Sequence, residues 1–172
     1  MTYNAAILTI SDRGAAGERA EDTSAQTIRE LLQGLPIDVI AYEVLPDEMP
    51  IITARLRELA DQPEVDLLLT TGGTGLAPRD VTPQATLAVI EYEVPGIAEA
   101  MRAEGLRHTP MAMLSRAVVG VRAQTLIVNL PGSPKGVHES LETVLAVLSH
   151  ALDKLAGSTE DCAPAPKHVG DA

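Results

Sequence analysis

The chain has 172 residues, 45% of them hydrophobic, which suits one domain with a substantial core and excludes a disordered chain. Its formal net charge is −11, and no block of basic residues offsets that charge, so general nucleic-acid binding is excluded. Aromatic residues make up only 2% of the chain, which removes the stacking surface that single-strand readers use. Cys162 is the only cysteine, so the chain forms no internal disulfide and no CxxC metal site.

No segment of the sequence has the length and composition of a membrane span. The longest runs without a charged residue, 67–78 and 123–134, fall short of the roughly 18 residues that a spanning helix needs. The N-terminal residues 1–4 contain no basic region and so show no secretory signal. We therefore expect a cytoplasmic protein that binds neither membranes nor nucleic acids.

In the first half of the chain, apolar runs alternate with segments of helical spacing. Apolar runs predict strands over 4–10, 37–45 and 65–71. A polar turn, Ser11–Gly14, and a loop follow the first strand, and a helix begins at Thr23. The helix between the second and third strands carries three apolar residues on one face, Ile52, Leu56 and Leu59.

The second half continues with helices and one pair of strands. Thr82-Pro83 is typical of a helix N-cap followed by proline at the first helical position, and Ser133-Pro134 repeats that pair. The other predicted elements are a helix from Pro95 to about Leu106, β segments over 117–122 and 125–130, and a helix after Ser133 with a long apolar stripe. We expect one domain over 1–156 and a flexible tail over 157–172.

Strands alternating with helices predict an α/β fold, in which helices cover both faces of a mostly parallel sheet. Ligands of such sheets bind outside the carboxyl ends of the strands. Three loops follow predicted strands there and are the candidates for a site: Ser11–Gly14, Pro46–Glu48 and Gly72–Thr82.

The segment over 70–83 carries the most chemical information. Gly72, Gly73 and Gly75 allow backbone N–H groups to approach a ligand closely, and Thr74 adds a hydroxyl. The helix start at Thr82 suits a phosphate, because free N–H groups and the positive end of the helix dipole face it. The segment is neither a P-loop nor a GxGxxG motif, and a tight turn that merely requires glycine is the competing interpretation.

Charged residues in these loops suggest a metal-assisted phosphate site. Arg79 supplies a cation and Asp80 a carboxylate that could hold Mg²⁺ beside a phosphate. Asp47 is either an N-cap of the next helix or a second carboxylate of the same cleft. Ser11 and Asp12 either line this edge of the sheet or form an ordinary turn. Paired carboxylates around Mg²⁺ are typical of phosphoryl and nucleotidyl transfer.

A second candidate anion site follows the predicted strand pair. Ser115 and Arg116 precede that pair, and Asn129-Leu-Pro-Gly-Ser-Pro-Lys135 joins its end to a capped helix. An ordinary helix start is the alternative for this segment. No histidine has a partner at metal-ligand spacing, and the GxSxG nucleophile motif is absent.

Five segments in order resemble the MoaB/Mog family of molybdenum cofactor biosynthesis, which includes the G domain of gephyrin. These are Leu-Thr-Ile-Ser-Asp at 8–12, Leu-Pro-Asp-Glu at 45–48, the glycine-rich segment at 70–83, Leu-Ser-Arg at 114–116 and Asn-Leu-Pro-Gly-Ser-Pro-Lys at 129–135. The resemblance implies a three-layer α/β/α sandwich, commonly assembled as a homotrimer. It also implies Mg²⁺-dependent transfer of an adenylyl group from ATP to the terminal phosphate of molybdopterin, with release of diphosphate.

By the same resemblance, Asp47 and Asp80 are the catalytic aspartates and the ligands of Mg²⁺. A metal-insertion protein of the MoeA type would receive the product. The expected substrate contacts lie in the loops named above and are Ser11, Asp12, Gly72, Gly73, Thr74, Gly75, Arg79, Thr82, Ser115, Arg116, Pro131, Gly132, Ser133 and Lys135. A molybdopterin-binding carrier without catalysis is the alternative function, and an unrelated nucleotide hydrolase is a remoter one. Because both substrates are anions, the acidic excess should lie mostly away from the cleft or be offset there.

Overall fold

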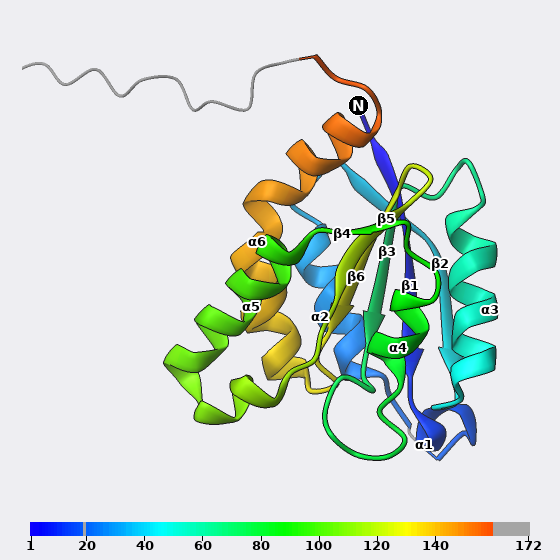
Figure 1. Cartoon of the computed structure of the whole chain (residues 1–172), viewed down its shortest axis with the longest axis vertical. Coiled ribbons are helices and arrows are strands. Elements are labelled where there is room, and N and C mark those ends of the chain that lie inside the picture. The colour runs from blue at the N-terminus through cyan, green and yellow to red at the C-terminus, as the bar shows by residue number, and fades with distance from the viewer. Residues whose placement is uncertain (19, 160–172) are drawn as a thin grey trace, which may run out of the picture.

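The computed structural model describes residues 1–18 and 20–159, so most of the predicted tail over 157–172 lies outside the described residues. One six-stranded sheet has the order β2-β1-β3-β6-β5-β4 (Figure 1). The strands are β1 (Tyr3–Ile10), β2 (Ile37–Leu45), β3 (Leu67–Thr71), β4 (Tyr92–Glu93), β5 (Val119–Arg122) and β6 (Thr125–Leu130). The helices are α1 (Asp12–Ala15), α2 (Thr23–Leu32), α3 (Met49–Ala60), α4 (Thr82–Leu87), α5 (Pro95–His108), α6 (Pro134–Leu155) and the 3₁₀ helix η1 (Pro110–Leu114).

The sheet is mostly parallel, as predicted. β1 pairs in parallel with β2 and β3, and β3 with β6, whereas β5 lies antiparallel to both β6 and β4. Residues 123–124 connect β5 directly to β6, which explains the antiparallel pair. The carboxyl ends of β1, β2, β3 and β6 consequently meet at one edge of the sheet.

Two apolar cores cover the two faces of the sheet, which confirms the predicted three-layer sandwich. Alternate residues of β1 point to opposite faces, so Ala5 and Ile7 lie in one core while Ala6 and Leu8 lie in the other. Helices α2, α5 and α6 pack in the first core, and α3 and α4 in the second (Figure 1). β3 is buried along its whole length, as expected for a central parallel strand.

The helix starts agree with the sequence patterns except at α4. The Ser133 side chain accepts a hydrogen bond from the Gly136 N–H and caps α6, as predicted. The N-cap of α4 is Val81, so the prediction that Thr82 caps this helix is wrong. The short elements α1, β4 and η1 were not predicted, because four, two and five residues are too few to show a period.

A buried hydrogen bond ties the first strand to the last helix. The Tyr3 hydroxyl donates to the Asp153 carboxylate, and this bond together with burial raises the pKa of Tyr3 to about 12. Unfolded tyrosine titrates near pH 10. The stabilisation is therefore complete below about pH 10 and is lost as the pH rises toward the folded pKa.

We expect Tyr3→Phe to lower the free energy of unfolding by about 1 kcal/mol at pH 8, because one hydrogen bond is removed. Urea unfolding at pH 8, 10 and 11.5 would measure this difference. It should shrink as the pH rises, since only the wild-type protein must keep a phenol protonated. A difference that stays constant over this range would contradict the assigned bond.

Within residues 1–18 and 20–159, no helix is both long and apolar enough to cross a membrane.

Candidate active site

The three predicted loops meet beyond the carboxyl ends of the strands, where the connections after β1 and β3 turn to opposite faces of the sheet. After β1 the chain continues to α2 on one face, and after β3 it continues to α4 on the other. β1 and β3 are neighbours, so their loops diverge and leave a crevice at the carboxyl edge. Figure 1 shows α1 and the loop between β3 and α4 just beyond the ends of these strands.

A polar cavity of about 770 Å³ occupies this crevice and is called the large cavity below. Its lining comes from the ends of β1 and β3, the loop after β2, the start of α2 and the loop before α6. Seven of the predicted site residues line it, namely Ser11, Asp47, Gly72, Gly73, Asp80, Gly132 and Ser133. Loops that lie far apart in the sequence are thus brought to one surface by the order of the strands.

The glycine-rich loop has no room for a side chain at two of its glycines. Gly72 has φ +99°, and a Cβ added there would lie 2.3 Å from the carbonyl oxygen of Ile10. Gly73 has φ +64°, and its Cβ would lie 2.3 Å from the Thr82 hydroxyl oxygen. Glycine is therefore required at both positions, by conformation and by close packing.

Thr82 holds this loop and does not face the cavity. Its side chain is completely buried, and its hydroxyl donates to the Gly72 carbonyl at 2.9 Å. The Thr82 N–H donates to the Gly73 carbonyl at 3.1 Å. Both donors of Thr82 are used within the loop, so the geometry does not favour the expected phosphate contact.

The loop before α6 packs directly on the glycine-rich loop. The Thr71 hydroxyl donates to the Pro131 carbonyl at 2.6 Å, and the Ser24 hydroxyl donates to the Gly132 carbonyl at 2.9 Å. Ser24 and Thr71 both line the large cavity and were missed by sequence reasoning. Thr71 ends a strand and could have been found there, whereas Ser24 lies within a helix whose orientation the sequence does not give.

Asp47 and Asp80 both lie against the glycine-rich loop and both line the large cavity. A Cβ at Gly73 would lie 3.2 Å from an Asp47 carboxylate oxygen, and one at Gly75 would lie 2.8 Å from an Asp80 carboxylate oxygen. Asp80 accepts from the Ala77 N–H at 2.8 Å, which orients its carboxylate. Asp47 is not a helix cap, because Glu48 holds the N-cap position of α3.

The electrostatic setting of Asp47 favours a cation in the cleft. Burial raises the pKa of Asp47, and the nearby Asp12 and Asp80 carboxylates raise it further. Because like charges that face one cavity repel, a cation placed between Asp47 and Asp80 would relieve that cost.

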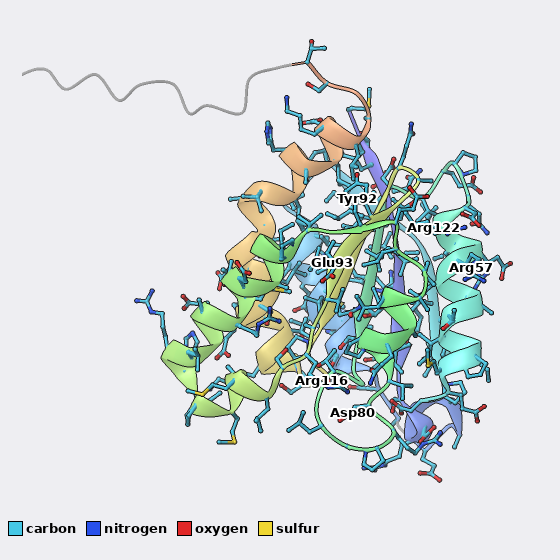
Figure 2. All side chains as sticks on the ribbon, viewed as in Figure 1. Arg57, Asp80, Tyr92, Glu93, Arg116 and Arg122 are labelled. Atoms are coloured by element: carbon cyan, nitrogen blue, oxygen red, sulfur yellow. The ribbon has the colours of Figure 1, made fainter. Side chains whose placement is uncertain are left out.

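Arg116 braces the loop that carries Asp80. Its guanidinium donates to the Gly75 carbonyl at 2.8 Å and to the Asp80 carbonyl at 2.5 Å. The Arg116 N–H donates to the Thr74 carbonyl at 3.0 Å. Figure 2 shows Arg116 beside Asp80 at the carboxyl edge. The Arg116 guanidinium thus holds the loop in place, and the substrate contact expected for this side chain stays a prediction.

We expect Arg116→Ala to lower the free energy of unfolding by about 1–3 kcal/mol, since two loop carbonyls lose their donors. Arg57→Ala is a matched control, because Arg57 is exposed and its guanidinium makes one long contact of 3.4 Å with a carbonyl. The control should change stability by no more than about 0.5 kcal/mol. Thermal and urea unfolding of both variants would measure this, and equal losses would contradict the bracing role.

A second, more apolar cavity of about 290 Å³ lies beside the first, between η1, α5 and α6. Four more of the predicted residues line it, namely Thr74, Gly75, Ser115 and Pro131, and Ser133 lines both cavities. Met101, Met111 and Leu114 supply much of its apolar wall. The glycine-rich loop and the loop before α6 thus form a wall shared by two cavities of different character.

Other predicted residues lie apart from both cavities. The Lys135 ammonium lies 3.7 Å from the Glu139 carboxylate on an outer groove, and 80% of its side chain is exposed. Arg79 is paired with Asp12 and lines neither cavity. Asn129, the first residue of the segment 129–135, is buried, and its amide donates to the Thr70 and Thr86 hydroxyls. It therefore holds the interior together and does not face a cavity.

Comparison with known proteins places this geometry in a family. A sequence model described as "Probable molybdopterin binding domain" matches residues 6–150. The chain belongs to the MoaB/Mog family.

Solved and curated relatives match most of this chain. The structure of the molybdopterin biosynthesis enzyme MoaB from Thermus thermophilus is 58% identical, with a TM-score of 0.86, and the match covers 91% of this chain and 98% of that one. The molybdopterin adenylyltransferase of Helicobacter pylori J99 is 39% identical over 159 residues, 91% of this chain and 90% of the relative. That of Escherichia coli K12 is 45% identical over 145 residues, 83% of this chain and 74% of the relative.

The donor set of this MoaB/Mog site fits a magnesium ion. Within the described residues, no group of three or more His, Cys, Asp or Glu side chains could hold a metal by itself. Mg²⁺ is commonly bound by one or two carboxylates together with water and substrate phosphates. Asp47 and Asp80, facing one cavity, supply that number of carboxylates.

Proposed function

We propose that this protein is a molybdopterin adenylyltransferase that uses ATP and Mg²⁺. One observation carries the proposal: Asp47 and Asp80 lie against the glycine-rich loop and line the same polar cavity. The relatives named molybdopterin adenylyltransferase match this chain over most of its length, which supports the same activity here.

The two cavities suit the two substrates. The polar cavity beside Asp47 and Asp80 would hold the triphosphate of ATP, and the more apolar cavity would hold the flat pterin. Ser133 lines both cavities, and the glycine-rich loop contributes Gly72 to the polar one and Gly75 to the apolar one, so a phosphate of the pterin substrate could reach the nucleotide where the cavities adjoin. Backbone N–H groups of the glycine-rich loop would face the phosphates.

In the proposed reaction, an oxygen of the terminal molybdopterin phosphate forms a bond to the α-phosphorus of ATP. The bond from that phosphorus to the oxygen bridging to the β-phosphate breaks, and diphosphate leaves with the electron pair. The attacking phosphate is already ionised at neutral pH, so the site needs no strong base. Positioning and charge neutralisation are the main contributions of the protein.

Asp47 and Asp80 would hold Mg²⁺, which when bound supplies positive charge against the phosphates. The carboxylates also exclude a bare anion from this part of the cavity, so nucleotide should bind as its magnesium complex. The excess of acidic residues over the whole chain is thus compatible with anionic substrates.

Incubation of the purified protein with molybdopterin, Mg²⁺ and ATP labelled at the α-phosphorus tests the proposal. We expect label in a pterin product, with one diphosphate released for each adenylyl group transferred. Addition of EDTA should abolish the transfer. Tight pterin binding without any labelled product would favour the non-catalytic carrier, and ADP formation without pterin would favour a hydrolase.

Three further features follow from the family resemblance and belong to the same proposal. We infer a homotrimer in the cytoplasm that passes its product to a metal-insertion protein of the MoeA type. Light scattering of the purified protein would measure its oligomeric state. A mass of three chains is expected, and a mass of one or two chains would contradict the homotrimer.

A further inference from the structure

Asp12 and Asp47 hold each other through a reciprocal pair of hydrogen bonds. The Asp12 N–H donates to one Asp47 carboxylate oxygen at 2.8 Å. The Asp47 N–H donates to an Asp12 carboxylate oxygen at 3.0 Å. Residues that follow β1 and β2 are thereby locked together directly at the edge of the large cavity.

The Asp12 carboxylate also binds Arg79, which belongs to the loop after β3. The Arg79 guanidinium donates to both Asp12 carboxylate oxygens, at 2.5 Å and 2.7 Å. Asp12 therefore links the loop that carries Asp47 to the loop that carries Asp80.

The ion pair between Asp12 and Arg79 contributes little to stability. The side chains of Asp12 and Arg79 are 42% and 57% exposed, and ion pairs this exposed contribute little to the free energy of folding. Neither residue lines the large cavity or the apolar cavity beside it. The substrate contacts expected for both residues are thus not what the geometry favours.

We propose that Asp12 is a positioning residue: its side chain holds the backbone N–H of Asp47 and, through Arg79, the loop that carries Asp80, and so sets the placement of the two carboxylates. The inference rests on the proposed function, because Asp47 must hold a cation for its orientation to matter. Residues that orient metal ligands by hydrogen bonds typically change metal affinity or activity by about 10–100-fold when removed.

Two substitutions separate the parts of this role. Asp12→Ala removes the acceptor for the Asp47 N–H and the partner of Arg79. Asp12→Asn keeps an oxygen acceptor for the Asp47 N–H and loses the negative charge that Arg79 binds. Asp61→Ala is the matched control, because Asp61 also receives two hydrogen bonds from one arginine, Arg122, at 2.7 Å and 3.0 Å. Figure 2 shows Arg122 far from Asp80, toward the other end of the sheet.

Binding of Mn²⁺ in the presence of ATP, measured by electron paramagnetic resonance, is the first readout. We expect Asp12→Ala to weaken Mn²⁺ binding by about 10–100-fold and to lower kcat by a similar factor, with KM for molybdopterin nearly unchanged. Asp12→Asn should recover most of the loss. The urea midpoint of Asp12→Ala should lie slightly below that of Asp61→Ala, since Asp12→Ala loses the acceptor of the Asp47 N–H as well as an ion pair, but both variants should remain folded.

The inference is overturned if Asp12→Ala binds Mn²⁺ and turns over like Asp61→Ala while the wild-type protein is active. An Asp12→Asn protein as impaired as Asp12→Ala would also contradict positioning through the Asp47 N–H. Failure of the proposed function looks different, because the wild-type protein itself would then form no adenylyl product.

Discussion

Asp80→Asn should lower kcat for adenylyl transfer by about 100-fold or more, because the change removes one of the two carboxylates that line the polar cavity and are proposed to hold Mg²⁺. The substitution preserves the local fold, since the amide oxygen of asparagine can still accept from the Ala77 N–H that Asp80 binds at 2.8 Å. Steady-state kinetics and Mn²⁺ affinity would measure the effect.

Asp66→Asn is the control for this experiment. Asp66 also accepts a backbone N–H, from Asn4 at 2.8 Å, and it precedes β3 at the opposite end of the sheet from the cavity. Its substitution removes the same charge from the chain and should leave kcat within about twofold of wild type. Equal turnover of Asp80→Asn and Asp66→Asn would rule out the role assigned to Asp80.

Gly72→Ala should destabilise the protein by about 3 kcal/mol or more and abolish most of the activity. Its φ of +99° is unfavourable for alanine, and the new Cβ would lie 2.3 Å from the Ile10 carbonyl oxygen, which belongs to a buried strand and cannot move aside. Displacement of the loop by about 1 Å would by itself cost roughly 100-fold in rate.

Gly17→Ala separates the two causes. Gly17 also has a positive φ, +72°, but a Cβ there would meet no atom within 4 Å. Its substitution should therefore cost only about 1 kcal/mol, from backbone strain alone. Urea unfolding of both variants gives the comparison, and similar losses would show that the contact with Ile10 is unimportant.

The sequence was sufficient to predict the layers of the fold and the edge of the sheet that carries the site. Apolar runs predicted β1, β2 and β3, and the rule that parallel strands end at one edge located Asp47 and Asp80 together. The pairing itself depended on β1 lying between β2 and β3, which the structure gives and local patterns do not.

The partners of individual side chains could not be predicted. The sequence left Thr82 and Arg116 free to bind a phosphate. In the structure Thr82 donates to a loop carbonyl 10 residues away along the chain, and Arg116 donates to two, 41 and 36 residues away. Ser24 reaches a loop 108 residues away. These contacts form where loops pack against one another, and that packing depends on the order of the strands. Residue type and local spacing therefore do not predict them.

The position of a bound metal tests the central claim most directly. Crystals of the wild-type protein grown with Mn²⁺ and α,β-methylene ATP would give an anomalous diffraction peak at each manganese ion. The account predicts a peak bonded to carboxylate oxygens of both Asp47 and Asp80, with the α-phosphate against residues 72–75. A peak away from these two carboxylates, or a nucleotide whose phosphates lie outside the large cavity, would contradict it.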